Sequence, residues 1–181
     1  MKVIFAHGKE SGPWGSKIQA LATLATARGC AVDSIDYQGM DDPDARVRRL
    51  LDELRREPDP KQLVLVGSSM GGYVSLVASE SIAVRGVFLL APALYIAGFG
   101  QQHYHSMCRH IEIVHGWSDD VIPPENSIRY AREADCALHM ISGDHALNGS
   151  LGVVAELFER FLRQVIAKTV AVSESAANSD I

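Results

Sequence analysis

The sequence lacks three features that would each mark a class of protein: a long basic run, paired cysteines and a long apolar segment. The net charge is −5 and no basic stripe is visible, so nucleic acid is not an expected partner. The densest basic segment alternates with acidic residues, which is typical of the solvated face of a helix. Its arginines are Arg46, Arg48, Arg49, Arg55 and Arg56.

The few cysteines argue against a disulfide framework. The chain has three cysteines, an odd number, and no two of them form a C-x-x-C pair: Cys30, Cys108 and Cys136. This fits free thiols in a reducing compartment. The N-terminal apolar run ends at His7 and Gly8, and it is too short for a signal peptide or a membrane span. We therefore expect a soluble, cytoplasmic protein.

Two patterns alternate regularly along the chain. Short apolar runs take turns with segments whose apolar residues recur at helical spacing, and several of the runs are apolar throughout. This order predicts βαβ units and a parallel sheet that is covered on both faces. The expected strands are 2–8, 31–37, 62–67, 85–92, 111–116 and 137–142, and the expected helices are 16–29, 41–57, 71–81, 124–134 and 150–168.

These elements predict an α/β fold, namely a three-layer α/β/α sandwich around a mostly parallel sheet of about six strands. The length of 181 residues suits a single domain, which we assign to residues 1–168. The irregular segment 93–110 is too short for a separate lid domain. Residues 169–181 are small and polar, and we expect them to be disordered.

A serine follows the third expected strand in a setting typical of a nucleophile. Residues 67–71 read GSSMG and match G-x-S-x-G, the nucleophile elbow, with Ser69 at the centre. The positions two residues away must lack side chains to fit the sharp turn, and bulky residues at those positions exclude Ser68. The alternative is a glycine-rich turn whose serine has no catalytic role.

A serine nucleophile needs a base, and the chain offers seven histidines. His145 follows the last expected strand and precedes the last helix, which fits the chain order of serine, acid and histidine. His139 lies within an expected strand, and we expect His7 to bond the backbone of its own loop. The histidines and cysteine of segment 103–110 have no second ligand group of matching spacing, so we predict no metal.

The acid that orients the histidine should follow a strand between the serine and the histidine. The loop after 111–116 supplies Asp119 and Asp120, and periodicity cannot select between adjacent loop residues. Asp144 adjoins His145 in the sequence and is poorly placed to reach the Nδ1 side of that ring.

Four stretches together resemble the α/β-hydrolase superfamily, and small bacterial serine esterases without a lid in particular: HGKESGPWGSK, GSSMGG, HGWSDDVIP and GDHAL. The resemblance covers the chain from Met1 to about Lys168. Members often show H-G-x-x-D-x-x-[VI]-P, with the catalytic Asp three residues after the Gly, and this spacing selects Asp119. The resemblance thus implies a triad of Ser69, Asp119 and His145.

The resemblance also implies an oxyanion hole and a function. Its donors would be the backbone N–H groups of Lys9 and Met70, with Glu10 replacing Lys9 if the register differs. The expected enzyme is a serine esterase or thioesterase that acts on a small acyl substrate without a cofactor. There are two alternatives: an acyltransferase that uses the same triad, or a binding or regulatory protein on a hydrolase scaffold that has lost catalysis. The expected pocket walls are Trp14, Tyr95, Phe99, Tyr104 and Trp117.

Overall fold

The computed structural model describes residues 1–177, and it describes side chains as far as residue 167. Six strands form one sheet in the order β2-β1-β3-β4-β5-β6, and all five pairings are parallel. The predicted α/β fold with a parallel sheet of six strands is confirmed. The strands are β1 (Lys2–Ala6), β2 (Ala31–Ile35), β3 (Leu63–Ser68), β4 (Gly86–Leu90), β5 (Ile111–Gly116) and β6 (Ala137–Ile141).

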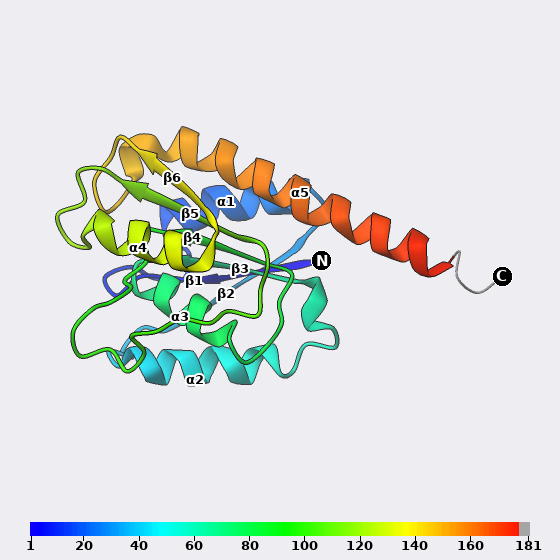
Figure 1. Ribbon diagram of the computed structural model, residues 1–181, viewed down its shortest axis with the longest axis horizontal. Helices are drawn as coiled ribbons and strands as arrows, with labels where there is room; N and C mark the ends of the chain where they lie inside the picture. The colour runs from blue at the N-terminus through cyan, green and yellow to red at the C-terminus, as the bar shows by residue number, and fades with distance from the viewer. Residues whose placement is uncertain (178–181) are drawn as a thin grey trace.

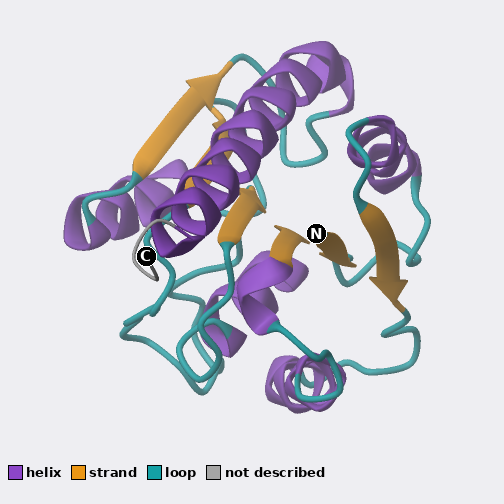
Figure 2. Ribbon diagram, turned by 90° about the vertical axis from the view of Figure 1, so that its right-hand side faces the viewer, coloured by secondary structure: helices purple, strands orange, loops and turns teal. Residues whose placement is uncertain are grey.

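Helices cover both faces of the sheet, as Figures 1 and 2 show. The strand residues alternate between two apolar clusters, because successive side chains of a strand point to opposite faces. Ile4 belongs to the cluster that also holds residues of α2, α3 and α4, whereas Val3 and Phe5 belong to the cluster of α1 and α5. The helices are α1 (Ser16–Ala27), α2 (Pro43–Leu54), α3 (Met70–Ala78), α4 (Pro124–Ala134) and α5 (Leu151–Ala177), with 3₁₀ turns η1 (Pro60–Gln62) and η2 (Asn148–Ser150).

The order in which the chain adds strands to the sheet reverses at β1 and β3, which are neighbours in the sheet. After β1 the chain passes through α1 to β2 on one side, and after β3 it passes through α3 to β4 on the other. Because α1 and α3 cover opposite faces, a crevice opens at the carboxyl ends of β1 and β3. Parallel doubly wound sheets bind ligands at such a point.

Helix α2 differs from its sequence-based interpretation at one position. Arg48, Arg49, Arg55 and Arg56 are exposed, as expected of a solvated face, but Arg46 is only 2% exposed. The alternation of charges could not reveal this, because Arg46 lies in the same turn as the buried Val47 and turns inward with it.

The C-terminal helix extends beyond the expected domain end. We predicted disorder from residue 169, whereas the structure describes the backbone as helical to Ala177, in a segment without glycine or proline. Residues 178–181 lie outside the described residues, and the division into a domain and a tail stays a prediction. Among the residues described, no helix is long and apolar enough to cross a membrane.

Candidate active site

The turn at the end of β3 holds Ser69 in a conformation that residues other than glycine rarely adopt. Its φ is 54° and its ψ is −120°, and strained backbone of this kind clusters at functional sites. A Cβ on Gly67 would overlap the carbonyl oxygen of Gly71, and a Cβ on Gly71 would overlap that of Ala6. The close approach of β1, β3 and α3 therefore requires both glycines of the motif.

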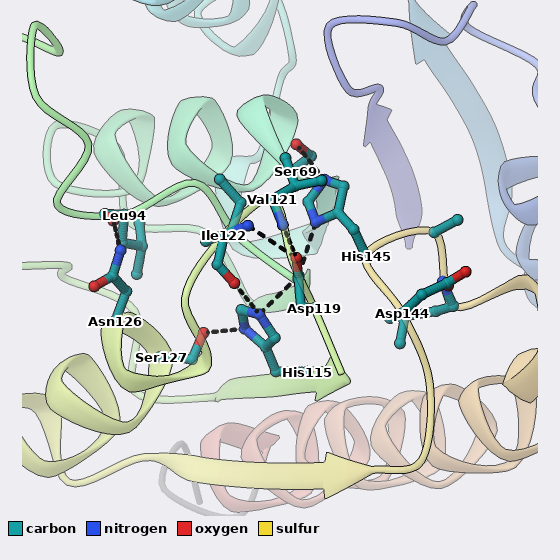
Figure 3. A network of polar contacts seen from close by, with 12 residues as sticks. Ser69, Leu94, His115, Asp119, Val121, Ile122, Asn126, Ser127, Asp144 and His145 are labelled. Carbon is teal, nitrogen blue, oxygen red and sulfur yellow. Dashed lines mark hydrogen bonds and ion pairs between the residues drawn. The ribbon is translucent and has the colours of Figure 1, made fainter. Parts of the chain in front are cut away.

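The structure brings Ser69, His145 and Asp119 into one hydrogen-bonded line (Figure 3). The Ser69 hydroxyl donates to His145 Nε2 over 2.9 Å, and His145 Nδ1 donates to Asp119 Oδ2 over 2.8 Å. The three residues come from the ends of β3, β6 and β5, and 76 positions separate the serine from the histidine. A nucleophile, a base and a group that orients the base require this arrangement.

Only one of the two neighbouring aspartates faces His145. Asp119 is 8% exposed and accepts four hydrogen bonds: from the backbone N–H groups of Val121 and Ile122 at Oδ1, and from two histidines at Oδ2. Burial raises the pKa of the Asp119 carboxyl, but these hydrogen bonds outweigh burial and hold the pKa below its ordinary value. Asp120 is exposed.

The second histidine on Asp119 is His115, which lies in the expected strand 111–116 and was not among the candidate site residues. Its Nε2 donates to Asp119 Oδ2 over 2.9 Å and also lies 3.1 Å from the carbonyl oxygen of Ile122. Nδ1 accepts from the hydroxyl of Ser127, 2.7 Å away (Figure 3). Burial lowers the pKa of His115 and so favours the neutral ring, whose Nε2–H donates to the Asp119 carboxylate and holds it in place.

The other polar candidates, Asp144 and His139, take no part in the hydrogen-bonded line from Ser69 to Asp119. Asp144 accepts a hydrogen bond from the Leu147 N–H and stabilises the loop that carries His145. His139 contacts Glu112 and Arg160 at the interface between β6 and α5, away from this line. Among the described residues, no group of three or more His, Cys, Asp or Glu side chains is arranged so that it could hold a metal ion.

The loop after β1 lies against the nucleophile. A Cβ on Gly8 would lie 3.4 Å from the Cβ of Ser69, so little space separates the two segments. Lys9, Glu10 and Met70 line the same cavity as Ser69. Met70 is the first residue of α3, and the N–H groups of a first helical turn have no partner within the helix. Donors are thus available on both sides of Ser69.

A cavity of about 650 Å³ opens beside Ser69 and His145, within the range of small-molecule sites. One charged side chain reaches from α1 toward the His145 loop: Lys17 Nζ donates to the carbonyl oxygen of Ala146 over 2.8 Å. Burial lowers the pKa of Lys17 to about 8, against the pull of Asp144 and Asp119. The apolar lining comes from Ile18, Met70, Ala93, Ile96, Phe99, Val121 and Ile122.

Of the five aromatic residues expected at the pocket wall, one lines the cavity beside Ser69 and four lie elsewhere. Phe99 lines the cavity. Tyr104 is instead a core residue that packs edge-on against other tyrosines, and Tyr95 donates its hydroxyl to Glu133. Trp14 and Trp117 lie in exposed loops and are 44% and 61% exposed. The apolar part of the wall comes from residues of separate loops and helices, and no sequence pattern marks them.

Known alpha/beta hydrolases share the fold of this chain. A family model described as alpha/beta hydrolase family matches residues 3–172. A protein of Xanthomonas campestris assigned to the alpha/beta hydrolase superfamily is 29% identical, with a TM-score of 0.83 over 90% of this chain and 98% of the other. Two further structures show the fold, and no curated protein matches the chain.

The first of these two is Est1E from Butyrivibrio proteoclasticus, which is 20% identical, with a TM-score of 0.75 over 92% of this chain and 88% of the other. The second is a lidless a/b serine hydrolase from Xanthomonas campestris, which is 18% identical, with a TM-score of 0.74 over 90% and 81%. With a family model that spans nearly all of its described residues, the chain belongs to the alpha/beta hydrolase family.

Proposed function

We propose that this protein is a serine hydrolase that cleaves a carboxylic ester or thioester of a small substrate through an acyl-enzyme. The hydrogen-bonded line from Ser69 through His145 to Asp119, at the wall of an apolar cavity, carries the proposal. Family membership supports a hydrolase, but the fold does not specify the bond that is cleaved.

In the first half of the reaction, Ser69 Oγ attacks the carbonyl carbon of the substrate while His145 Nε2 takes the hydroxyl proton. The carbonyl oxygen becomes an oxyanion, which accepts hydrogen bonds from the backbone N–H groups of Lys9 and Met70. When the tetrahedral intermediate collapses, the bond to the leaving oxygen or sulfur breaks, and His145 returns its proton to that atom. The acyl group stays on Ser69.

In the second half, water attacks the acyl carbon and His145 takes a proton from it. The ester bond to Ser69 Oγ then breaks, Oγ regains a proton from His145, and the carboxylic acid leaves. Asp119 keeps its charge throughout and stabilises the imidazolium that forms twice. An acyltransferase would follow the same steps with an alcohol, amine or thiol in place of water.

A fluorophosphonate probe tests the nucleophile directly, because it reacts with an activated serine and not with a solvated one. We expect covalent labelling of the intact protein at Ser69, and no labelling of Ser69→Ala. An absence of labelling in the intact protein would contradict the proposal and favour a binding protein on a hydrolase scaffold.

Substrate choice requires a second measurement. A panel of p-nitrophenyl esters of rising chain length, assayed beside acyl-CoA thioesters, compares kcat/KM between the two classes. The cavity volume of about 650 Å³ leads us to expect the highest values for short or medium acyl groups.

A further inference from the structure

Arg46 of α2 is a buried cation that the proposed chemistry does not use. Its hydrogen-bond partners are backbone carbonyls, and none of them is a carboxylate. The guanidinium also lies over the ring of Tyr37, 5.3 Å from the centroid. Burying a charge without a carboxylate contact costs free energy of folding. A physical role is therefore needed to explain a buried arginine at this position.

The guanidinium binds the loop that follows β1. Nη1 donates to the carbonyl oxygens of His7 and Gly8, over 3.2 and 3.3 Å, and Nε donates to that of Met40 over 2.7 Å. His7 Nδ1 donates to the same Gly8 oxygen over 2.7 Å, while His7 Nε2 accepts from the Tyr37 N–H. Two donors therefore fix the direction of the Gly8 carbonyl.

That direction decides where the next N–H points. The Gly8 carbonyl and the Lys9 N–H belong to one planar trans peptide, in which the two groups point in opposite directions. With the oxygen held toward Arg46 and His7, the Lys9 N–H faces away from them. Gly8 and Lys9 line the cavity of Ser69 and Arg46 does not, so the side away from Arg46 is the side of the cavity.

We propose that Arg46 is a positioning residue for the oxyanion hole, which aims the Lys9 N–H at the developing oxyanion. The proposal rests on the proposed serine hydrolase function. A cation on the carbonyl oxygen also draws electron density from the peptide and makes its N–H a stronger donor. The charge of the guanidinium further favours a negative charge that develops nearby.

The test separates transition-state stabilisation from substrate binding. In Arg46→Met we expect kcat for a p-nitrophenyl ester to fall by about 10- to 100-fold, less than the loss of a whole oxyanion donor, with KM changed by less than about threefold. A boronic acid, which forms a tetrahedral anion on the serine, should bind more weakly by a similar factor. Its inhibition constant is the readout that a purely structural role would not move.

Two further variants serve as controls. Arg46→Lys keeps the charge but loses the planar fork, and we expect a smaller, several-fold loss of kcat. Arg49→Met removes an arginine from the same helix, one whose guanidinium is exposed and pairs with Glu53, and it should behave as the wild type. Circular dichroism and thermal unfolding of each variant show whether it is folded.

Each outcome decides the proposal. Unchanged kcat and unchanged boronic acid affinity in Arg46→Met would overturn it, and so would a higher KM at constant kcat. If Arg46→Met does not fold, the same two measurements on Arg46→Lys test the proposal. A kcat of Arg46→Lys within twofold of the wild type would overturn it. A wild type that hydrolyses no ester and takes up no probe would instead refute the proposed function, and this proposal with it.

Discussion

At the residue scale, the environment of the Asp119 carboxylate determines its charge and its orientation in the candidate site. Burial penalises its charge, but hydrogen bonds from the Ile122 and Val121 N–H groups and from His145 favour the charged form and hold the pKa below its ordinary value of 3.8. Because the folded pKa lies below the unfolded one, the carboxylate stabilises the fold above about pH 3.8. This contribution is lost as the pH falls through the lower, folded pKa.

At the same scale, exchange of either aspartate for asparagine tests which one orients His145. Asp119→Asn should lower kcat by about 10³- to 10⁴-fold, because an amide cannot hold the imidazole in the required tautomer. Asp120→Asn should stay within about threefold of the wild type, because the exposed Asp120 side chain contacts neither His145 nor Ser69 in the structure. Steady-state kinetics on one ester measures both, and the reverse result would mean that Asp120 supplies the acid.

At the scale of elements, the site depends on how closely α3 approaches β1. The N-terminal end of α3 carries the elbow, and Gly71 is the contact at which a side chain would overlap the Ala6 carbonyl. The loop after β1 and the turn after β3 are consequently held against each other. The distance between Ser69 and the proposed oxyanion donors therefore depends on helix packing as much as on the sequence motif.

This contact predicts a difference between two Gly→Ala changes in helices. Gly71→Ala should destabilise the protein by about 1–3 kcal/mol, because the backbone must move to accept the methyl group, and it should also reduce activity. Gly152→Ala in α5, where nothing lies within 4 Å of the added Cβ, should be neutral or stabilising by up to about 1 kcal/mol. Urea denaturation compares the two, and equal effects would show that the Gly71 contact is not tight.

At the scale of the whole molecule, the N-terminal part of α5 completes the core. The buried side chains of this helix belong to the cluster shared with α1 and with one face of the sheet, and the last of them among the described side chains is Val165. These buried residues are Val154, Phe158, Phe161, Leu162 and Val165. Helix α5 therefore contributes to the core before the expected domain end at Lys168.

A chain that ends at Lys168 should accordingly keep its fold and its activity. We expect its melting temperature to lie within about 2 °C of that of the full chain, since the buried side chains described in α5 all precede Lys168. A chain that ends at Arg160 loses Phe161, Leu162 and Val165 and should unfold at a far lower temperature or not fold. Calorimetry distinguishes these results, and a large loss in the first truncation would place the domain end beyond Lys168.

Most of the fold could be predicted from the sequence, because apolar periodicity and turn residues act locally. The alternation of strand and helix predicted all six strands and all five helices, and the G-x-S-x-G spacing marked the elbow on which Ser69 lies. Chain order pointed to His145 as the base. Spacing within a motif, taken from family resemblance, preferred Asp119 to Asp120, and the structure brings Asp119 to within 2.8 Å of His145.

What the sequence could not determine depends on contacts between distant segments. His115 and Arg46 look like a strand end and a member of a charged helix, yet one donates to Asp119 and the other holds the loop beside Ser69. Four of the five aromatic residues expected at the pocket wall lie outside the cavity for the same reason, because segments far apart in the chain line it. Local patterns determine which residues form strands and helices, whereas only the packing of those elements decides which side chains meet.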